Sequence, residues 1–167
     1  AFRTRPPSNW AAVWLSGEWL ALREGVSSRS HEQYDDWLGV FFENHVIEEM
    51  GLYQEPGHPN SYDLFTRYHM ADMLENGYEG RHRERLESLM RTGLDRSLAV
   101  QLSDGSLASA HRSTGQTWTL GAQCAYFTHA ANFFRSDDPI RSDAAADAAR
   151  RALASMARYQ RPEGPFS

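Results

Sequence analysis

The chain has 167 residues, a mass of 19.0 kDa, a net charge of -5 and a pI near 5.8. This length fits one domain, residues 1–167, and 41% hydrophobic residues suffice for a packed core, which excludes a mainly disordered chain. Acidic residues outnumber basic ones, 22 to 17, without a basic stripe, which argues against a nucleic-acid partner. One cysteine, Cys124, excludes an intramolecular disulfide and a cysteine zinc cage, and we expect it to be a buried structural thiol.

Hydrophobic periodicity predicts a helical protein. Six helices are expected, in chain order over residues 10–22, 31–50, 62–74, 81–100, 117–134 and 139–156. The second, fourth and sixth have one apolar face, and the sixth begins with Asp137 or Asp138 as N-cap and Pro139 in its first turn. The first, third and fifth carry apolar or small residues on nearly every face, which predicts burial on all sides.

The order loop, buried helix, amphipathic helix occurs three times. The polar residues that open the buried helices, Asn9, Asn60 and Gln116, are 51 and 56 residues apart. Such spacing indicates repeated helical hairpins in two layers, and it is longer than the period of about 34 residues of tetratricopeptide repeats. We therefore expect an all-α fold of hairpins from an (α/α) toroid, with at most a short β-hairpin near 100–112, where Asp104 and Gly105 form a turn signal.

No transmembrane segment or signal peptide is expected. The chain opens Ala1-Phe2-Arg3-Thr4 without a charged region followed by an apolar run. The segment 113–134 lacks charged residues, yet its glutamines, histidine and asparagine make it too polar for a membrane span. These features favour a cytoplasmic protein without a membrane partner, and a processed secreted form stays open.

Several stretches resemble a bacterial family of α/α-toroid proteins, similar to unsaturated glucuronyl hydrolases and heparinase-type polysaccharide lyases. The stretches that carry the resemblance are 60–69, 76–80, 104–106, 111–113 and 116–118. The likeness extends from about Asn9 to Pro165. Toroids of this kind contain about twelve helices, so the six expected here imply half a ring that belongs to a longer chain or completes itself by self-association.

The resemblance implies a substrate cleft lined by the loops before the inner helices and by their first turns. Tyr62 and Asp63 open the second inner helix, where a carboxylate in an aromatic setting is suited to acid or base work on a glycosidic bond. Asp63 has an alternative role as a helix cap, or as the partner of Arg67 four residues later, which suits a base better than an acid. His69 lies deeper, and a core histidine is its alternative.

His111 and Arg112 precede the least charged helix, with Gln116 and Trp118 close behind. Arginine binds a carboxylate through two parallel hydrogen bonds, and a tryptophan face stacks on a sugar ring. The expected catalytic residues are therefore Asp63, His111 and Tyr62. The expected substrate-binding residues are Asn60, His69, Arg112, Gln116 and Trp118. The alternatives are a solvated loop for His111 and Arg112, and core packing for Trp118.

These residues predict a carbohydrate-active enzyme, a glycoside hydrolase that acts on acidic or uronic-acid-containing glycans. A polysaccharide lyase stays open, because Tyr62, His69, His111 and Arg112 offer a neutral base and a carboxylate clamp. A non-catalytic helical scaffold or binding module is the rival. We expect no cofactor and no metal, and the sequence contains neither a phosphate-binding glycine loop nor a Gly-x-Ser-x-Gly elbow.

Overall fold

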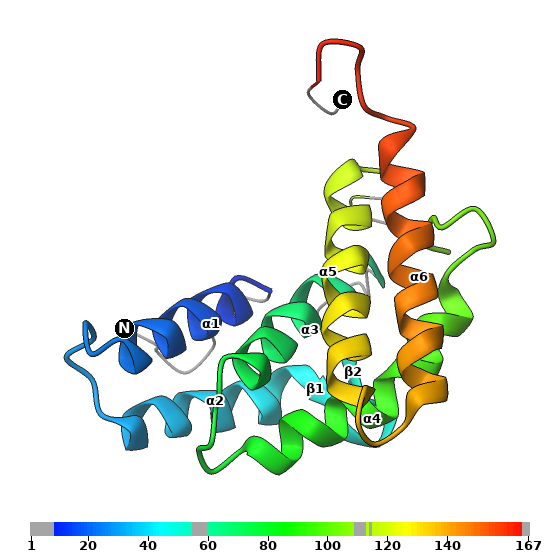
Figure 1. The fold of residues 1–167 in the computed structure, drawn as a ribbon. Helices are drawn as coiled ribbons and strands as arrows, with labels where there is room; N and C mark the ends of the chain where they lie inside the picture. The colour runs from blue at the N-terminus through cyan, green and yellow to red at the C-terminus, as the bar shows by residue number, and fades with distance from the viewer. Residues whose placement is uncertain (1–8, 55–59, 109–112, 114, 165–167) are drawn as a thin grey trace.

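The computed structural model describes residues 9–54, 60–108, 113 and 115–164, and most of these are helical. The described part contains six α-helices: α1 Trp10–Arg23, α2 His31–His45, α3 Asn60–Glu75, α4 Arg83–Val100, α5 Thr117–Phe134 and α6 Pro139–Ala157 (Figure 1). The predicted all-α class and the six helices are confirmed.

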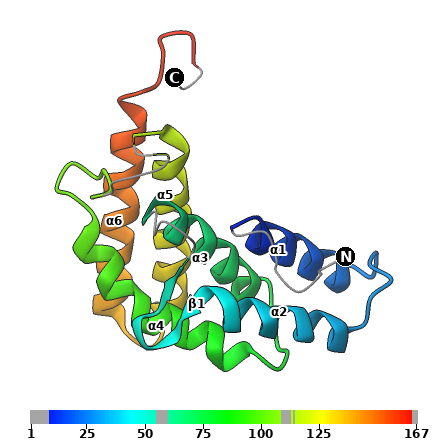
Figure 2. The same cartoon turned by 180° about the vertical axis from the view of Figure 1, so that it is seen from behind.

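Helices α1, α3 and α5 lie side by side, with α3 between the other two in both views (Figures 1 and 2). Each of these three helices contacts the helix that follows it in the chain: α1 contacts α2, α3 contacts α4, and α5 packs along α6. One apolar cluster, which includes Tyr34, Met73 and Leu86, joins α1, α2, α3 and the first part of α4. A second, which includes Leu94 and Phe127, joins α3 through α6. Helices α3 and α4 contribute to both clusters, and α3 is the central helix because it contacts α1, α4 and α5.

Local capping signals mark the starts of two helices, one of which was expected. Ser30 accepts a hydrogen bond from the backbone N–H of Gln33, whose side chain accepts one from the backbone N–H of Ser30, a capping box at the start of α2. Asp138 accepts a hydrogen bond from the backbone N–H of Arg141, and Pro139 occupies the first turn of α6. Of the two N-caps predicted for α6, Asp138 is therefore the one used.

The predicted helix 31–50 is too long. Helix α2 ends at His45, and an antiparallel pair of two-residue strands follows, β1 Val46–Ile47 and β2 Leu52–Tyr53, joined by the 3₁₀ turn η1 Glu48–Met50. Val46 is already extended, as suits a β-branched residue, and Gly51 has φ 64°, which lets the chain reverse.

The hairpin predicted near 100–112 is reduced to a turn with one bridge. Gln101 pairs with Leu107 outside any strand, and Gly105, at φ 84°, occupies the turn between them. Residues 109–112 lie outside the described part of the chain. The short sheet of the described residues therefore lies at 46–53, where it was not expected.

The first, third and fifth helices, here called the inner helices, were predicted to be buried on every side. This prediction is wrong for α1 and α5. Helix α1 exposes Trp10 and Gly17, and α5 exposes Thr128 and Asn132. In α3 the side chains described from Ser61 to Leu74 are buried or half-buried, since neighbours lie on both sides. None of the described helices is both long and apolar enough to cross a lipid bilayer.

Candidate aromatic site on α3 and α5

The starts of α3 and α5 lie next to each other. The rings of Tyr62 and Trp118 are 5.4 Å apart, and near the other ends of these helices Asn132 donates a hydrogen bond of 2.9 Å to Glu75. The two helices therefore run parallel, and residues that lie 56 or 57 positions apart in the chain are neighbours across the contact. This parallel packing brings two of the predicted site residues, Tyr62 and Trp118, into contact.

Further aromatic side chains extend this contact along α3. Phe65 lies 5.4 Å from Trp118, 5.6 Å from Tyr68 and 5.1 Å from His69, measured between ring centres. All five residues are half-buried. We call Tyr62, Phe65, Tyr68, His69 and Trp118 the aromatic cluster. Its rings meet edge-on or tilted, the arrangement that aromatic side chains prefer.

Polar contacts hold the two ends of this cluster. The hydroxyl group of Tyr62 lies 3.0 Å from that of Ser113, a residue with φ 66°. The indole N–H of Trp118 donates to the side-chain oxygen of Gln116, whose backbone carbonyl accepts a hydrogen bond of 2.7 Å from the hydroxyl of Thr119. Gln116, the exposed residue before α5, therefore orients the Trp118 ring.

Asp63 makes the predicted pair with Arg67. Its Oδ1 accepts hydrogen bonds from Arg67 Nε, at 2.9 Å, and from the backbone N–H of Tyr53 in β2, at 2.7 Å. Its Oδ2 accepts from Arg67 Nη2, at 2.5 Å. The carboxylate thus accepts hydrogen bonds at both oxygens and links the first turn of α3 to the short sheet.

Arg67 is fully buried and connects three helices. Besides Asp63, its guanidinium donates to the hydroxyl of Tyr126 in α5, at 2.6 Å, and to that of Ser97 in α4, at 2.5 Å. Burial alone lowers the pKa of Arg67, but Asp63 and Tyr126 outweigh it and raise the pKa above its ordinary value. This network is a structural centre of the fold, next to the aromatic cluster on the same helix.

His69 is enclosed by aromatic rings and has a buried Nε2 without a hydrogen-bond partner. Burial lowers the pKa of His69 to about 4; Asp72 opposes this shift and His129 adds to it. Burial and Asp72 raise the pKa of the neighbouring Tyr68. At neutral pH the cluster therefore presents a neutral imidazole and a protonated phenol.

The structure does not describe the side chains of three further predicted site residues, Asn60, His111 and Arg112. Asn60 begins α3, although its side chain is not described. His111 and Arg112 lie outside the described residues. The predicted meeting of these two with Asp63 and Trp118 stays a prediction. Cys124, expected to be buried, is half-buried on α5.

Sequence reasoning missed Phe65 and Tyr68 as site residues. Phe65 lies three residues after Tyr62, and Tyr68 three after Phe65, so each is a helical neighbour of the residue before it. It also missed Asp72, which follows His69 by three and accepts a hydrogen bond of 2.8 Å from Ser16 in α1. The helical spacing was the available signal, but only the packing shows that both aromatic residues are half-buried and that Phe65 contacts Trp118 of α5.

Comparison with known proteins gives no match: no protein-family model, no curated protein and no solved structure is similar to this chain.

Proposed function

We propose that this protein binds a carbohydrate on the aromatic cluster and acts on acidic or uronic-acid-containing glycans. One observation carries the proposal: five half-buried aromatic side chains contact one another in a series that runs from the start of α5 along the first part of α3 to its middle. Tryptophan and tyrosine faces stack on the C–H face of sugar rings while their polar atoms stay hydrated. Gln116 and Asp72 lie at the edges of this cluster as hydrogen-bonding groups for sugar hydroxyls.

If the protein is an enzyme, the hydrogen bonds that Asp63 accepts limit the catalytic role that this carboxylate can have. A hydrolase needs a carboxylic acid that gives a proton to the leaving oxygen. Asp63 accepts hydrogen bonds at both oxygens from Arg67 and Tyr53, which suits a base and not a proton donor. Hydrolysis with Asp63 as base remains our proposal; elimination by Tyr62 or His111 with Arg112 at the substrate carboxylate is the alternative.

The non-catalytic alternative also has a specific observation in its favour. Asp63 and Arg67 belong to a buried network that holds α3, α4 and α5 together, the role expected of a structural pair. In that case the aromatic cluster binds a glycan, or a partner, without chemistry.

Binding is tested with a panel of uronic-acid oligosaccharides and tryptophan fluorescence. We expect saturable binding that Trp118→Ala weakens about 5-fold, since loss of a stacking partner costs on the order of 1 kcal/mol. The control is Trp37→Ala, a half-buried tryptophan on the outer helix α2. Equal effects of both substitutions, or no binding to any oligosaccharide, would contradict the proposal.

Activity is tested on the same panel. New reducing ends without a new chromophore indicate hydrolysis, whereas rising absorbance at about 230–235 nm indicates the conjugated product of elimination. Binding without either product would contradict an enzymatic function and favour a non-catalytic glycan-binding module.

A further inference from the structure

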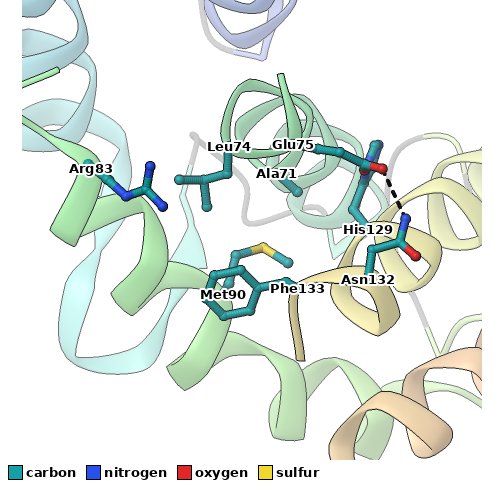
Figure 3. A pocket seen from close by; sticks show the side chains of 8 residues that line it. All are labelled: Ala71, Leu74, Glu75, Arg83, Met90, His129, Asn132 and Phe133. Carbon is teal, nitrogen blue, oxygen red and sulfur yellow. Dashed lines mark hydrogen bonds and ion pairs between the residues drawn. The ribbon is translucent and has the colours of Figure 1, made fainter. Parts of the chain in front are cut away.

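A cavity of about 190 Å³ lies where α3, α4 and α5 meet, towards the carboxyl ends of α3 and α5 (Figure 3). The aromatic cluster begins at the opposite ends of the same two helices and shares no residue with this cavity, although His129 of the cavity wall lies close enough to His69 to act on its pKa. All the residues that line it belong to the described part of the chain.

Most of the cavity wall is apolar. Ala71 and Leu74 of α3, Met90 of α4 and Phe133 of α5 surround the space (Figure 3). An apolar protein cavity of about 150 Å³ is large enough for benzene. The cavity therefore accepts a single ring or a short branched aliphatic group, with Met90 and Phe133 as its contacts.

One side of the cavity carries a carboxylate that still has hydrogen-bonding capacity. Glu75 Oε1 accepts a hydrogen bond of 2.9 Å from Asn132, and Oε2 pairs with Nδ1 of His129. The side chain of Glu75 is 44% exposed. Each carboxylate oxygen has two acceptor positions, so Glu75 can accept a further hydrogen bond from a ligand.

The two formal charges that line the cavity are neutralised to different degrees. Arg83 lies across the space from Glu75 (Figure 3). Its Nε donates to Glu87 at 2.8 Å and its Nη1 pairs with Glu79, so two carboxylates neutralise this guanidinium.

Two further arginines near the cavity have partners of their own. Arg91, which lies over the Phe133 ring, pairs with Asp137, and Arg135 donates to Asn132. Among the described residues no arginine pairs with Glu75, and its carboxylate therefore favours a positively charged ligand over an anion.

We propose that this cavity is a binding site for a small organic cation, a primary amine with an aromatic or short aliphatic body. The apolar body lies between Leu74, Met90 and Phe133, and the ammonium group donates a hydrogen bond to Glu75. The site shares no residue with the aromatic cluster, so variants of Glu75 and of Trp118 test the two proposals separately.

The test uses benzylamine as the probe, with benzyl alcohol and benzoate as the neutral and anionic counterparts. Binding is followed through the methyl NMR signal of Met90, assigned with Met90→Leu. We expect saturable shifts with benzylamine, weaker binding of benzyl alcohol and the weakest binding of benzoate. Tighter binding of benzoate than of benzylamine would overturn the proposal and point to Arg83, and so would the absence of saturable shifts.

Two charge variants separate a specific contact from a general effect of charge. Glu75→Gln removes the proposed partner of the ammonium and is expected to weaken benzylamine binding about 10-fold or more, since hydrogen bonds to ionised groups are the strong ones. Glu84→Gln removes the same charge from an exposed position on α4 and is expected to leave binding unchanged. If both variants weaken benzylamine binding equally, or if Glu75→Gln does not weaken it, the proposal that Glu75 binds the ammonium group is wrong.

Discussion

Arg67 holds Asp63 through hydrogen bonds from Nε, at 2.9 and 3.1 Å, and from Nη2, at 2.5 Å, although the two residues are only one helical turn apart. The arginine side chain is 1% exposed and that of the aspartate 16% exposed. Because Arg67 also reaches Ser97 and Tyr126, this pair joins the first turn of α3 to both α4 and α5.

Asp63→Asn leaves the buried Arg67 without its counter-charge. We expect a loss of about 3–5 kcal/mol in the free energy of unfolding, measured with urea, because a buried charge without its partner keeps the desolvation penalty. The matched control is Asp36→Asn, which breaks the exposed pair with Arg81 and is expected to change little. Similar stabilities of the two variants would contradict the view that Asp63 stabilises the fold as the counter-charge of the buried Arg67.

A double variant sharpens this test. Asp63→Asn with Arg67→Met removes both charges, and we expect it to be more stable than Asp63→Asn alone, since an apolar side chain replaces the unpaired charge. If the double variant loses as much free energy of unfolding as Asp63→Asn and Arg67→Met lose together when each is made alone, the unpaired charge is not the cause of the instability of Asp63→Asn.

The lowered pKa of His69 makes stability depend on pH. In the folded protein this pKa is about 4, whereas an unfolded chain has about 6.5. Between these values the unfolded chain binds more protons, so stability is lost as the pH falls from about 6.5 to about 4. The slope reaches at most about 1.4 kcal/mol per pH unit. Urea unfolding at several pH values measures it.

His69→Gln is expected to flatten this slope, whatever its effect on stability at neutral pH. His31→Gln, at an exposed position, is the control and is expected to keep the slope of the natural chain. Parallel curves for His69→Gln and the natural chain would show that another group carries the dependence.

Two glycines with positive φ are expected to differ in their tolerance of alanine. At Gly51, φ 64°, an added Cβ meets the backbone of Thr92 and Gly93 in α4, whereas at Gly77, φ 76°, it meets nothing within 4 Å. Gly77→Ala should cost about 1 kcal/mol for the left-handed backbone, and Gly51→Ala about 1–3 kcal/mol more for the clash. Thermal unfolding compares the two, and equal losses would contradict this close packing.

The open face of α1 is expected to support self-association or contact with further chain. Trp10 is 67% exposed, and Val13, Gly17 and Leu20 continue the same face without a charge. Such apolar stripes mark interaction surfaces. We expect sedimentation to show a species larger than one chain. Leu20→Arg, at a half-buried position on this face, should reduce it, and Leu102→Arg, at an exposed leucine elsewhere, should not. A monomer at every concentration would contradict self-association.

Part of the candidate site was visible in the sequence. Tyr62 and Trp118 open charge-poor helices, a position that marks them as candidates, and the Asp63–Arg67 pair follows from a spacing of four residues. The role of Phe65 and Tyr68 was not visible, because helical spacing does not tell which face of α3 meets Trp118 of α5.

The sequence by itself determined the helices and several of their boundaries, such as Asp138 and Pro139 at the start of α6, because capping and periodicity act within a few residues. The tertiary structure decided where α2 stops and which groups surround Arg67. Its partners Ser97 and Tyr126 lie 30 and 59 residues away in the chain. It also decided where the cavity beside Glu75 opens, since three helices must pack before the space exists. Contacts between residues far apart in the sequence depend on which helix faces meet, and no local pattern specifies that.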